Sequence, residues 1–314
     1  MNTRMAGAAR EHADAIAEAP IFYPSEEEFD DFVGYVSTVL APQCAVHGIC
    51  KVVPPAGWRG PSPQRQAGRE AGFTIRSPIE QHVVGCQGLY QIFNEERLRM
   101  TLERFERQAV AIEAREAVSC LGEDEAVERF WKEIATARAP LYGSDLEGSF
   151  FPPPIDLRRW NLRALPDLLR LGPAALPTEL KGINSPMLYM GRWRTLFPLH
   201  AEDMDLFSIN YLHSGATKQW YGISPRSADH VELLAAQCFP RLHSTCRQFL
   251  RHKASLIAPE VFIANGVALS SLRQRAGTPR AHLIVYSIGS PVASEPTPLH
   301  PAPLHPAPPH PVHA

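Results

Sequence analysis

The sequence predicts an α+β fold, in which a helical N-terminal part packs on a β-rich C-terminal core. Apolar residues recur at helical spacing near the N-terminus, as at Phe29, Phe32, Val33 and Val36. From about residue 186 onward, short aromatic and apolar runs alternate with glycine and proline, which is the spacing of strands in an antiparallel sheet or barrel. The composition, with 45% hydrophobic and 20% charged residues, is typical of a folded globular chain.

The N-terminal half is expected to hold two helices separated by an irregular stretch. Residues 24–40 predict the first helix, because Ser25 can cap it and three glutamates suit its positive end. Residues 54–76 are rich in proline and glycine and read as a linker or a long surface loop. Residues 95–118 are charged, with apolar side chains at helical spacing, and predict a surface helix.

The C-terminal half is expected to be mainly β-structure. Strands are predicted over residues 188–199, 206–212 and 219–223, and Ser224-Pro225 then opens a helix. Residues 291–314 are so rich in proline that an extended, disordered tail is expected there, and residues 1–20 are also expected to be disordered.

Charge and cysteine content exclude several classes of protein. The 31 Lys and Arg residues against 33 Asp and Glu give a net charge of -2, so sequence-specific DNA binding is not expected. The six cysteines form no C-x-x-C pair, which argues against a disulfide-stapled secreted domain. The chain shows no signal peptide and no apolar run of about 18 residues, so we expect an intracellular protein without a membrane partner.

The first chemical signal is His200-Ala201-Glu202. In a strand, residues two apart point the same way, so this imidazole and this carboxylate can bind one metal ion together. With a distant second histidine, such a pair forms the facial triad of a non-haem Fe(II) oxygenase. Alone, the motif is weak, because a solvated pair of the same spacing occurs by chance.

Longer phrases around this pair resemble the JmjC catalytic domain of histone demethylases that act on trimethylated lysine. They include Phe197-Pro198-Leu199-His200-Ala201-Glu202-Asp203-Met204-Asp205 and Ser208-Ile209-Asn210-Tyr211-Leu212-His213. The likeness continues through residues 140–145, 182–189, 218–221 and 249–253, and residues 21–58 resemble the JmjN module. The resemblance implies a cupin-like double-stranded β-helix. It implies a JmjN module over 21–62, a linker and helical segment over 63–153, and a JmjC domain over 154–290.

The resemblance also implies a site. His200 and Glu202 would bind Fe(II), and Tyr142, Asn210 and Lys218 would hold 2-oxoglutarate beside an apolar wall formed by Phe197. Gly182, Tyr189 and Glu202 would surround the methylated lysine. For Tyr189 and Lys218, a core tyrosine and a surface lysine are the alternatives that the residues alone leave open. The implied activity is demethylation of the histone H3 tail, at the ninth or the thirty-sixth residue, in nuclear chromatin.

Two departures from the family pattern begin after Gly277. The family's third iron ligand, a histidine, falls on Ile288 in this register, and His282 is the nearby imidazole. A structural zinc site would use Cys246 and His252, but its two later cysteines are absent. The barrel is therefore expected to be incomplete. The alternatives are a catalytically inactive JmjC protein that binds histone tails or chromatin partners, and a truncated product without a stable fold.

Overall fold

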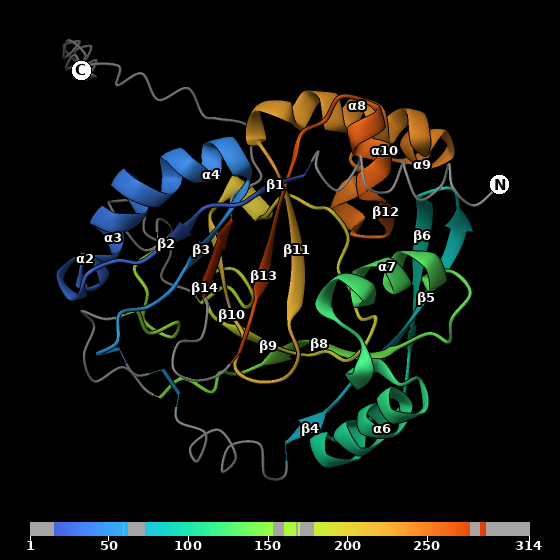
Figure 1. Cartoon of the computed structure of the whole chain (residues 1–314), viewed down its shortest axis with the longest axis horizontal. Helices are drawn as coiled ribbons and strands as arrows, with labels where there is room; N and C mark the ends of the chain where they lie inside the picture. The colour runs from blue at the N-terminus through green and yellow to red at the C-terminus, as the bar shows by residue number, and fades with distance from the viewer. Residues whose placement is uncertain are drawn as a thin grey trace, which may run out of the picture.

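The computed structural model describes residues 16–58, 60–61, 73–152, 160–167, 169, 179–276 and 283–286. Within these ranges the chain forms helices and mainly antiparallel sheets, which confirms the α+β prediction. In Figure 1 the helices lie around the outside and the strands run through the middle. The predicted C-terminal tail over residues 291–314 lies outside the described residues. In the described part of the chain, no helix has the length and apolar character needed to cross a membrane.

Three sheets carry most of the β-structure. The largest has the strand order β12 (Ser255–Ile257), β6 (Leu89–Glu96), β5 (Ile79–Cys86), β8 (Leu141–Glu147), β9 (Met187–Met190). A three-stranded sheet has the order β1 (Ile16–Glu18), β13 (Leu269–Gln274), β11 (Lys218–Ile223). A four-stranded sheet has the order β10 (Ser208–Tyr211), β14 (Leu283–Tyr286), β3 (Ile49–Val52), β2 (Ile21–Phe22). The short strands β4 (Thr74–Ile75) and β7 (Met100–Thr101) form a separate pair.

The N-terminal segment is built into these sheets. Strand β1 pairs in parallel with β13, and β3 pairs with β14 (Figure 1). The expectation of disorder up to residue 20 is therefore wrong for residues 16–18. Because its partner strand lies more than two hundred residues away in sequence, the sequence near β1 carries no sign of this pairing.

The predicted helix over residues 24–40 is confirmed, although it is divided. Ser25 caps α2 (Glu26–Asp30) in a capping box with Glu28, as its sequence indicates. Asp31 caps α3 (Phe32–Tyr35), which passes through a π-helical turn (Val36–Leu40) into α4 (Ala41–His47). The aromatic face of α2 stacks Phe29 on Trp160, with ring centroids 4.8 Å apart.

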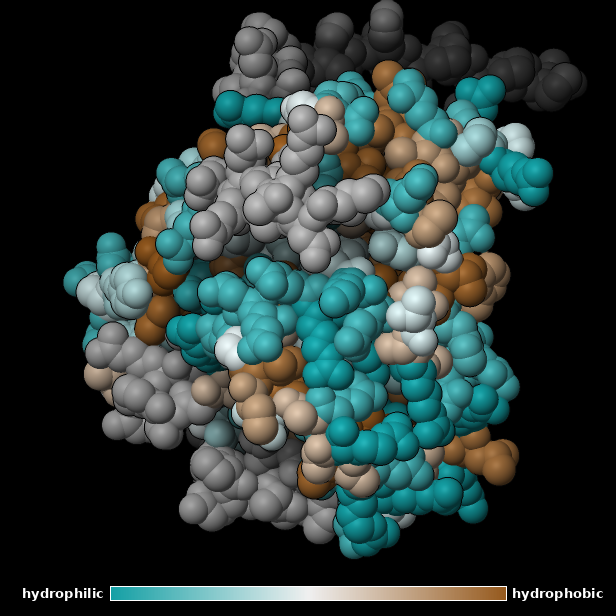
Figure 2. All heavy atoms as spheres, turned by 45° about the vertical axis from the view of Figure 1, so that its right-hand side comes forward, coloured by the Kyte–Doolittle hydropathy of each residue, from teal (hydrophilic) through white to brown (hydrophobic). Residues whose placement is uncertain are grey.

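The second predicted helix begins later than expected. Strand β6 continues to Glu96, and α6 (Leu102–Arg115) starts only after Thr101, whose hydroxyl accepts from the Arg104 amide. A further helix, α7 (Glu123–Glu133), comes after α6. These helices lie on the right side of Figure 1. Figure 2 turns that side toward the viewer, and hydrophilic side chains cover much of it.

The C-terminal helices cover one end of the sheets. After β11, a short 3-10 turn (Pro225–Ser227) leads into α8 (Ala228–Cys238), as predicted, and α9 (Pro240–Thr245) and a 3-10 helix (Phe249–His252) follow. With α10 (Pro259–Ala264) they enclose an apolar cluster that includes Val231, Leu234, Phe249 and Phe262.

Candidate functional site

The segment that leads to His200 is a loop rather than the expected strand. Strand β9 ends at Met190, and no strand is assigned from residue 191 to residue 207. Arg194 adopts a left-handed backbone, with φ 69°, in the middle of a turn, which interrupts any pleat. The strand prediction over residues 188–199 is therefore wrong beyond Met190.

His200 and Glu202 nevertheless face one another. His200 Nε2 lies 3.4 Å from Glu202 Oε1, and the two side chains are only 10% and 21% exposed. The other ring nitrogen, Nδ1, lies 2.8 Å from the carbonyl oxygen of Pro198, to which it can donate. That bond fixes the imidazole and leaves Nε2 as the free ligand atom.

This geometry fits a shared metal ion. Two ligand atoms about 2.1 Å from one ion, at right angles, lie about 3 Å apart, close to the observed separation. A neutral imidazole nitrogen and a carboxylate oxygen are also the donor set of the two-histidine, one-carboxylate iron sites. The pair supplies two of the three protein ligands that such a site uses.

A buried ammonium group lies beside the pair. Lys218, at the start of β11, places Nζ 3.4 Å from Asn210 Oδ1, and Asn210 lies on β10. The same Nζ lies over the rings of Phe197 and Trp220, at 5.2 and 4.8 Å from their centroids. Burial lowers the pKa of Lys218 to about 8. Among the described residues no carboxylate pairs with this amine, so the pocket holds a cation and an amide without a protein anion.

Phe197 connects the two halves of the site. Its ring meets the His200 ring edge to face at 5.9 Å and the Trp220 ring at 5.1 Å. An anion held by Lys218 therefore has an apolar wall on the side toward the histidine. This is the arrangement expected for a dicarboxylate that is anchored at one end and reaches toward a metal at the other.

The buried side-chain amide of Gln274 connects the strands that carry Lys218 and Asn210. Gln274 on β13 is fully buried, accepts from Trp220 Nε1 at 3.0 Å, and donates to the carbonyl oxygen of Asn210 at 3.0 Å. One side chain thus ties three neighbouring strands, β13, β11 and β10. Sequence reasoning missed Gln274, and its strand, which also contains Ser270, Ser271 and Arg273, carries no sequence signal that sets this glutamine apart.

Two tyrosines form the opposite wall. Tyr142 on β8 is buried, and its ring lies 6.4 Å from that of Tyr189 on β9. The Tyr189 hydroxyl donates to Asp145 Oδ1 at 3.0 Å. Burial and the neighbouring Asp145 carboxylate, with a smaller effect of Glu202, raise the pKa of Tyr189. Asp145 was not among the predicted site residues, although it stands in the phrase that matched the family.

One cavity joins all of these groups. The predicted residues Tyr142, Gly182, Tyr189, Phe197, His200, Glu202, Asn210 and Lys218 all line it, together with Asp145 and Trp220. Gly182 has a φ of 77° in a turn that closes between Lys181 and Ser185, a backbone conformation that favours glycine. Direct contacts join His200 to Glu202 and to Phe197, and join Lys218 to Asn210 and to Phe197. Tyr142 lies against Tyr189, and Gly182 shares only the lining of this large cavity.

The sequence was expected to lack a third iron ligand and to hold an incomplete zinc site. Ile288 and His282 both lie outside the described residues. Cys246 is half-buried against the C-terminal apolar cluster, and His252 is exposed at the end of a 3-10 helix. Within the described ranges, the single group of three potential ligands is Glu80, His82 and Glu95, whose carboxylates already pair with Arg97.

Comparison with known proteins agrees with this geometry. Residues 187–278 match the JmjC domain, hydroxylase family, and residues 20–54 match the jmjN domain family. The chain is 34% identical over 257 residues to lysine-specific demethylase 4D of Rattus norvegicus, and 35% identical over 256 residues to lysine-specific demethylase 4B of Mus musculus. It is 33% identical over 256 residues to probable lysine-specific demethylase 4F of Homo sapiens.

Each of these alignments covers 82% of the chain, but they cover 49%, 23% and 39% of the three relatives in turn. The chain therefore spans about half of the first relative and less of the others. Both domain matches confirm the predicted family and its double-stranded β-helix. The cavity between β8, β9, β10 and β11 carries the residues by which the family was predicted. The chain thus belongs to the JmjN/JmjC family that includes the lysine-specific demethylases.

Proposed function

We propose that this protein is an Fe(II)- and 2-oxoglutarate-dependent demethylase of methylated lysines on the histone H3 tail, at the ninth or the thirty-sixth residue. The observation that carries the proposal is the buried Lys218–Asn210 pair beside the converging His200 and Glu202. We further propose that it acts in the nucleus on chromatin, where a demethylase of histone lysines would meet its substrate; its relatives are named lysine-specific demethylases.

Each subsite supports one part of this activity. His200 and Glu202 would hold Fe(II), which when bound supplies the oxidising chemistry for the N-methyl group. Lys218 and Asn210 would bind the distal carboxylate of 2-oxoglutarate by charge and by a hydrogen bond, and Phe197 would keep water from that end. Tyr142 completes this proposed subsite from β8.

The mouth of the cavity suits a methylated ammonium. A quaternary ammonium has no N–H to donate, so it is recognised by oxygen atoms and aromatic faces. Tyr189 offers a ring, and Asp145 and Glu202 offer carboxylates around it. Gly182, whose positive φ favours glycine, lines the same cavity.

A second candidate function is a JmjC protein that binds histone tails or chromatin partners without chemistry. The observation that favours it is the sequence after β14, because residues 287–294 contain no His, Cys, Asp or Glu. An iron held by His200 and Glu202 alone would bind weakly, since the facial triad uses three protein ligands. Both candidate functions use the same peptide subsite, but only the demethylase requires a bound iron.

The test is turnover of trimethyl-lysine peptides from the histone H3 tail. The purified chain is incubated with Fe(II) and 2-oxoglutarate, and mass spectrometry follows the loss of methyl groups while succinate is measured in parallel. The proposed enzyme loses both signals in His200→Ala and Lys218→Met, and keeps them in Lys132→Met, an exposed lysine on α7. Peptide binding without either product in the parent chain would support the inactive alternative.

A further inference from the structure

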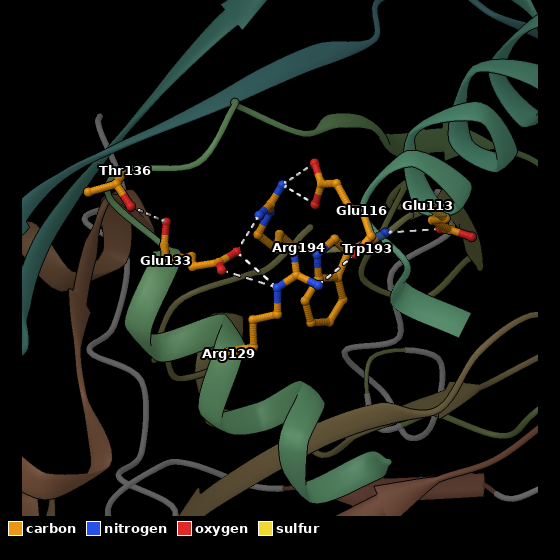
Figure 3. Close-up of polar contacts among 7 residues, drawn as sticks. All are labelled: Glu113, Glu116, Arg129, Glu133, Thr136, Trp193 and Arg194. Atoms are coloured by element: carbon orange, nitrogen blue, oxygen red, sulfur yellow. Dashed lines mark hydrogen bonds and ion pairs between the residues drawn. The ribbon is translucent and has the colours of Figure 1, made fainter. Parts of the chain in front are cut away.

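A partly buried ion cluster, centred on the buried Arg194, lies just before the segment that carries Phe197 and His200. Arg194 is 8% exposed, and its guanidinium binds both oxygens of Glu116 at 2.8 and 2.7 Å (Figure 3). It also reaches Glu133 Oε2 at 3.2 Å. Glu116 follows the end of α6 and Glu133 ends α7, so a single side chain connects the loop to two helices.

A second arginine completes the cluster without contacting the loop. Arg129 binds Glu133 from one turn earlier on the same helix, with Nε 3.1 Å from each carboxylate oxygen. Its Nη1 donates to the carbonyl oxygen of Glu116 at 2.7 Å (Figure 3). Two cations thus balance two carboxylates, which a buried ionic cluster requires in order to be stable.

The backbone at Arg194 is strained, and the ion pairs hold it there. A φ of 69° is uncommon for a residue with a side chain, and such residues persist where their surroundings fix them. The turn is closed locally by Thr195, whose hydroxyl donates to the Arg192 carbonyl at 2.8 Å. The contact of Arg194 Nη2 with both carboxylate oxygens of Glu116 then sets the direction of the whole turn relative to α6.

Leu196, two residues after Arg194, is also fixed by hydrogen bonds. Gln81 on β5 is 4% exposed, and its amide makes two hydrogen bonds to the backbone of Leu196. It donates to the Leu196 carbonyl at 2.9 Å and accepts from the Leu196 amide at 3.0 Å. Leu196 directly precedes Phe197, so the path into the metal-binding segment is fixed at two successive points.

Helix α7, which carries Arg129 and Glu133, also contacts the co-substrate side of the site. At the start of α7, Glu123 accepts from Thr217 at 2.8 Å and from Arg275 at 2.6 Å. These hydrogen bonds, that from Arg275 foremost, lower the pKa of Glu123 to about 2. Thr217 directly precedes Lys218. Helix α7, about 16 Å long, therefore holds the residue next to Lys218 at one end and the loop before His200 at the other.

We propose that Arg194 is a positioning residue for the metal-binding segment. Through its ion pair with Arg194, α7 fixes the position of Phe197 and His200 relative to Lys218. This inference rests on the proposed function of the site. Arg194 touches neither the proposed ligands nor the co-substrate pocket in the described contacts, so its effect passes through the turn and Leu196.

The test compares Arg194→Met with Arg129→Met in the full chain. Both variants remove one cation from the same cluster, but only the first releases the loop. Hydrogen–deuterium exchange is measured for residues 191–202 and for α8, which lies outside the cluster. Binding of Co(II), an oxygen-stable substitute for Fe(II), is followed by visible absorption.

We expect Arg194→Met to speed exchange in residues 191–202 at least tenfold relative to α8 and to weaken Co(II) binding at least tenfold. Arg129→Met should change neither the exchange rate of residues 191–202 relative to α8 nor the dissociation constant for Co(II) by more than about twofold. Arg194→Lys, which keeps the charge but lacks the two separate nitrogens that reach Glu116 and Glu133, should fall between them. If Arg194→Met is too unstable to purify, the double variant Glu116→Gln with Arg194→Met removes the unpaired carboxylate and takes its place.

Equal acceleration of residues 191–202 and α8 would show a merely structural role and overturn the inference. If the parent chain binds no Co(II), the proposed iron site fails, while the exchange ratio still decides whether Arg194 fixes the loop. The two failures are therefore distinguishable.

Discussion

At the scale of single residues, the site depends on groups whose protonation is set by burial. Lys218 loses its aqueous surroundings among Phe197, Trp220 and Asn210, and its pKa falls to about 8. The amine of the free protein is therefore mostly protonated at neutral pH and loses its charge as the pH rises through about 8. A bound dicarboxylate restores the partner that the amine lacks, so binding and protonation are linked.

The pH dependence of co-substrate binding follows from this linkage. Because the free amine loses its proton as the pH rises through about 8, the dissociation constant for 2-oxoglutarate should increase by up to about tenfold for each pH unit above that value. Calorimetry from about pH 6.5 to about pH 9.5 measures it. Lys218→Met should bind at least tenfold more weakly and show no such slope, whereas Lys132→Met should behave as the parent chain. A parent affinity that is flat across this range would contradict the account.

Gln274 gives a second prediction at this scale. Gln274→Leu leaves Trp220 Nε1 and the Asn210 carbonyl buried without their partner, and each such group costs about 1–3 kcal/mol. We expect the free energy of unfolding to fall by about 2–5 kcal/mol, measured by urea denaturation. Gln248→Leu, at an exposed position, should change it by less than about 0.5 kcal/mol. Equal values for the two variants would exclude the bridging role of Gln274.

At the scale of elements, β14 is the decisive strand. It pairs antiparallel with β10 and with β3, with Asn210 opposite Ile284 and Cys50 opposite Val285. It therefore connects the JmjN and JmjC parts within one sheet. The residues after Gly277 depart from the family pattern, yet residues 283–286, Leu-Ile-Val-Tyr, still supply this connection.

A proline in β14 tests that connection. Val285→Pro removes an N–H from a strand paired on both sides, where proline is not tolerated. We expect the thermal unfolding midpoint to fall by at least about 5 °C, or the chain to become insoluble, because a loss of 1 kcal/mol alone shifts the midpoint by a few degrees. The control is Leu98→Pro, in an exposed segment outside any strand, which should leave the midpoint within about 2 °C. Matching midpoints for the two prolines would mean that β14 does not hold the sheet together.

At the scale of the whole molecule, the sequence predicted the residues of the site better than their backbone. His200 and Glu202 converge as expected, although neither lies in a strand, because the Pro198 carbonyl orients the imidazole within the loop. Lys218 and Asn210 meet because a short connection, residues 212–217, returns the chain from the end of β10 to the start of β11. Those outcomes depend on residue type and spacing, which a sequence displays directly.

The features that could not be predicted depend on contacts between distant segments. Strand β1 exists because β13 accepts it as a parallel neighbour, and nothing in Ile16–Glu18 marks that partner. The ion cluster at Arg194 joins three segments whose charges each look like ordinary surface charges in sequence. Gln81 and Gln274 likewise owe their roles to backbone groups that only the folded chain brings near.

The most direct test of the central claim is iron binding by the purified chain under anaerobic conditions, with and without 2-oxoglutarate. If His200 and Glu202 share an ion beside the Lys218 pocket, one Fe(II) should bind per chain, more tightly when 2-oxoglutarate is present. His200→Ala should abolish this binding, and Lys218→Met should abolish the effect of 2-oxoglutarate. A parent chain that binds no more iron than His200→Ala would contradict the account.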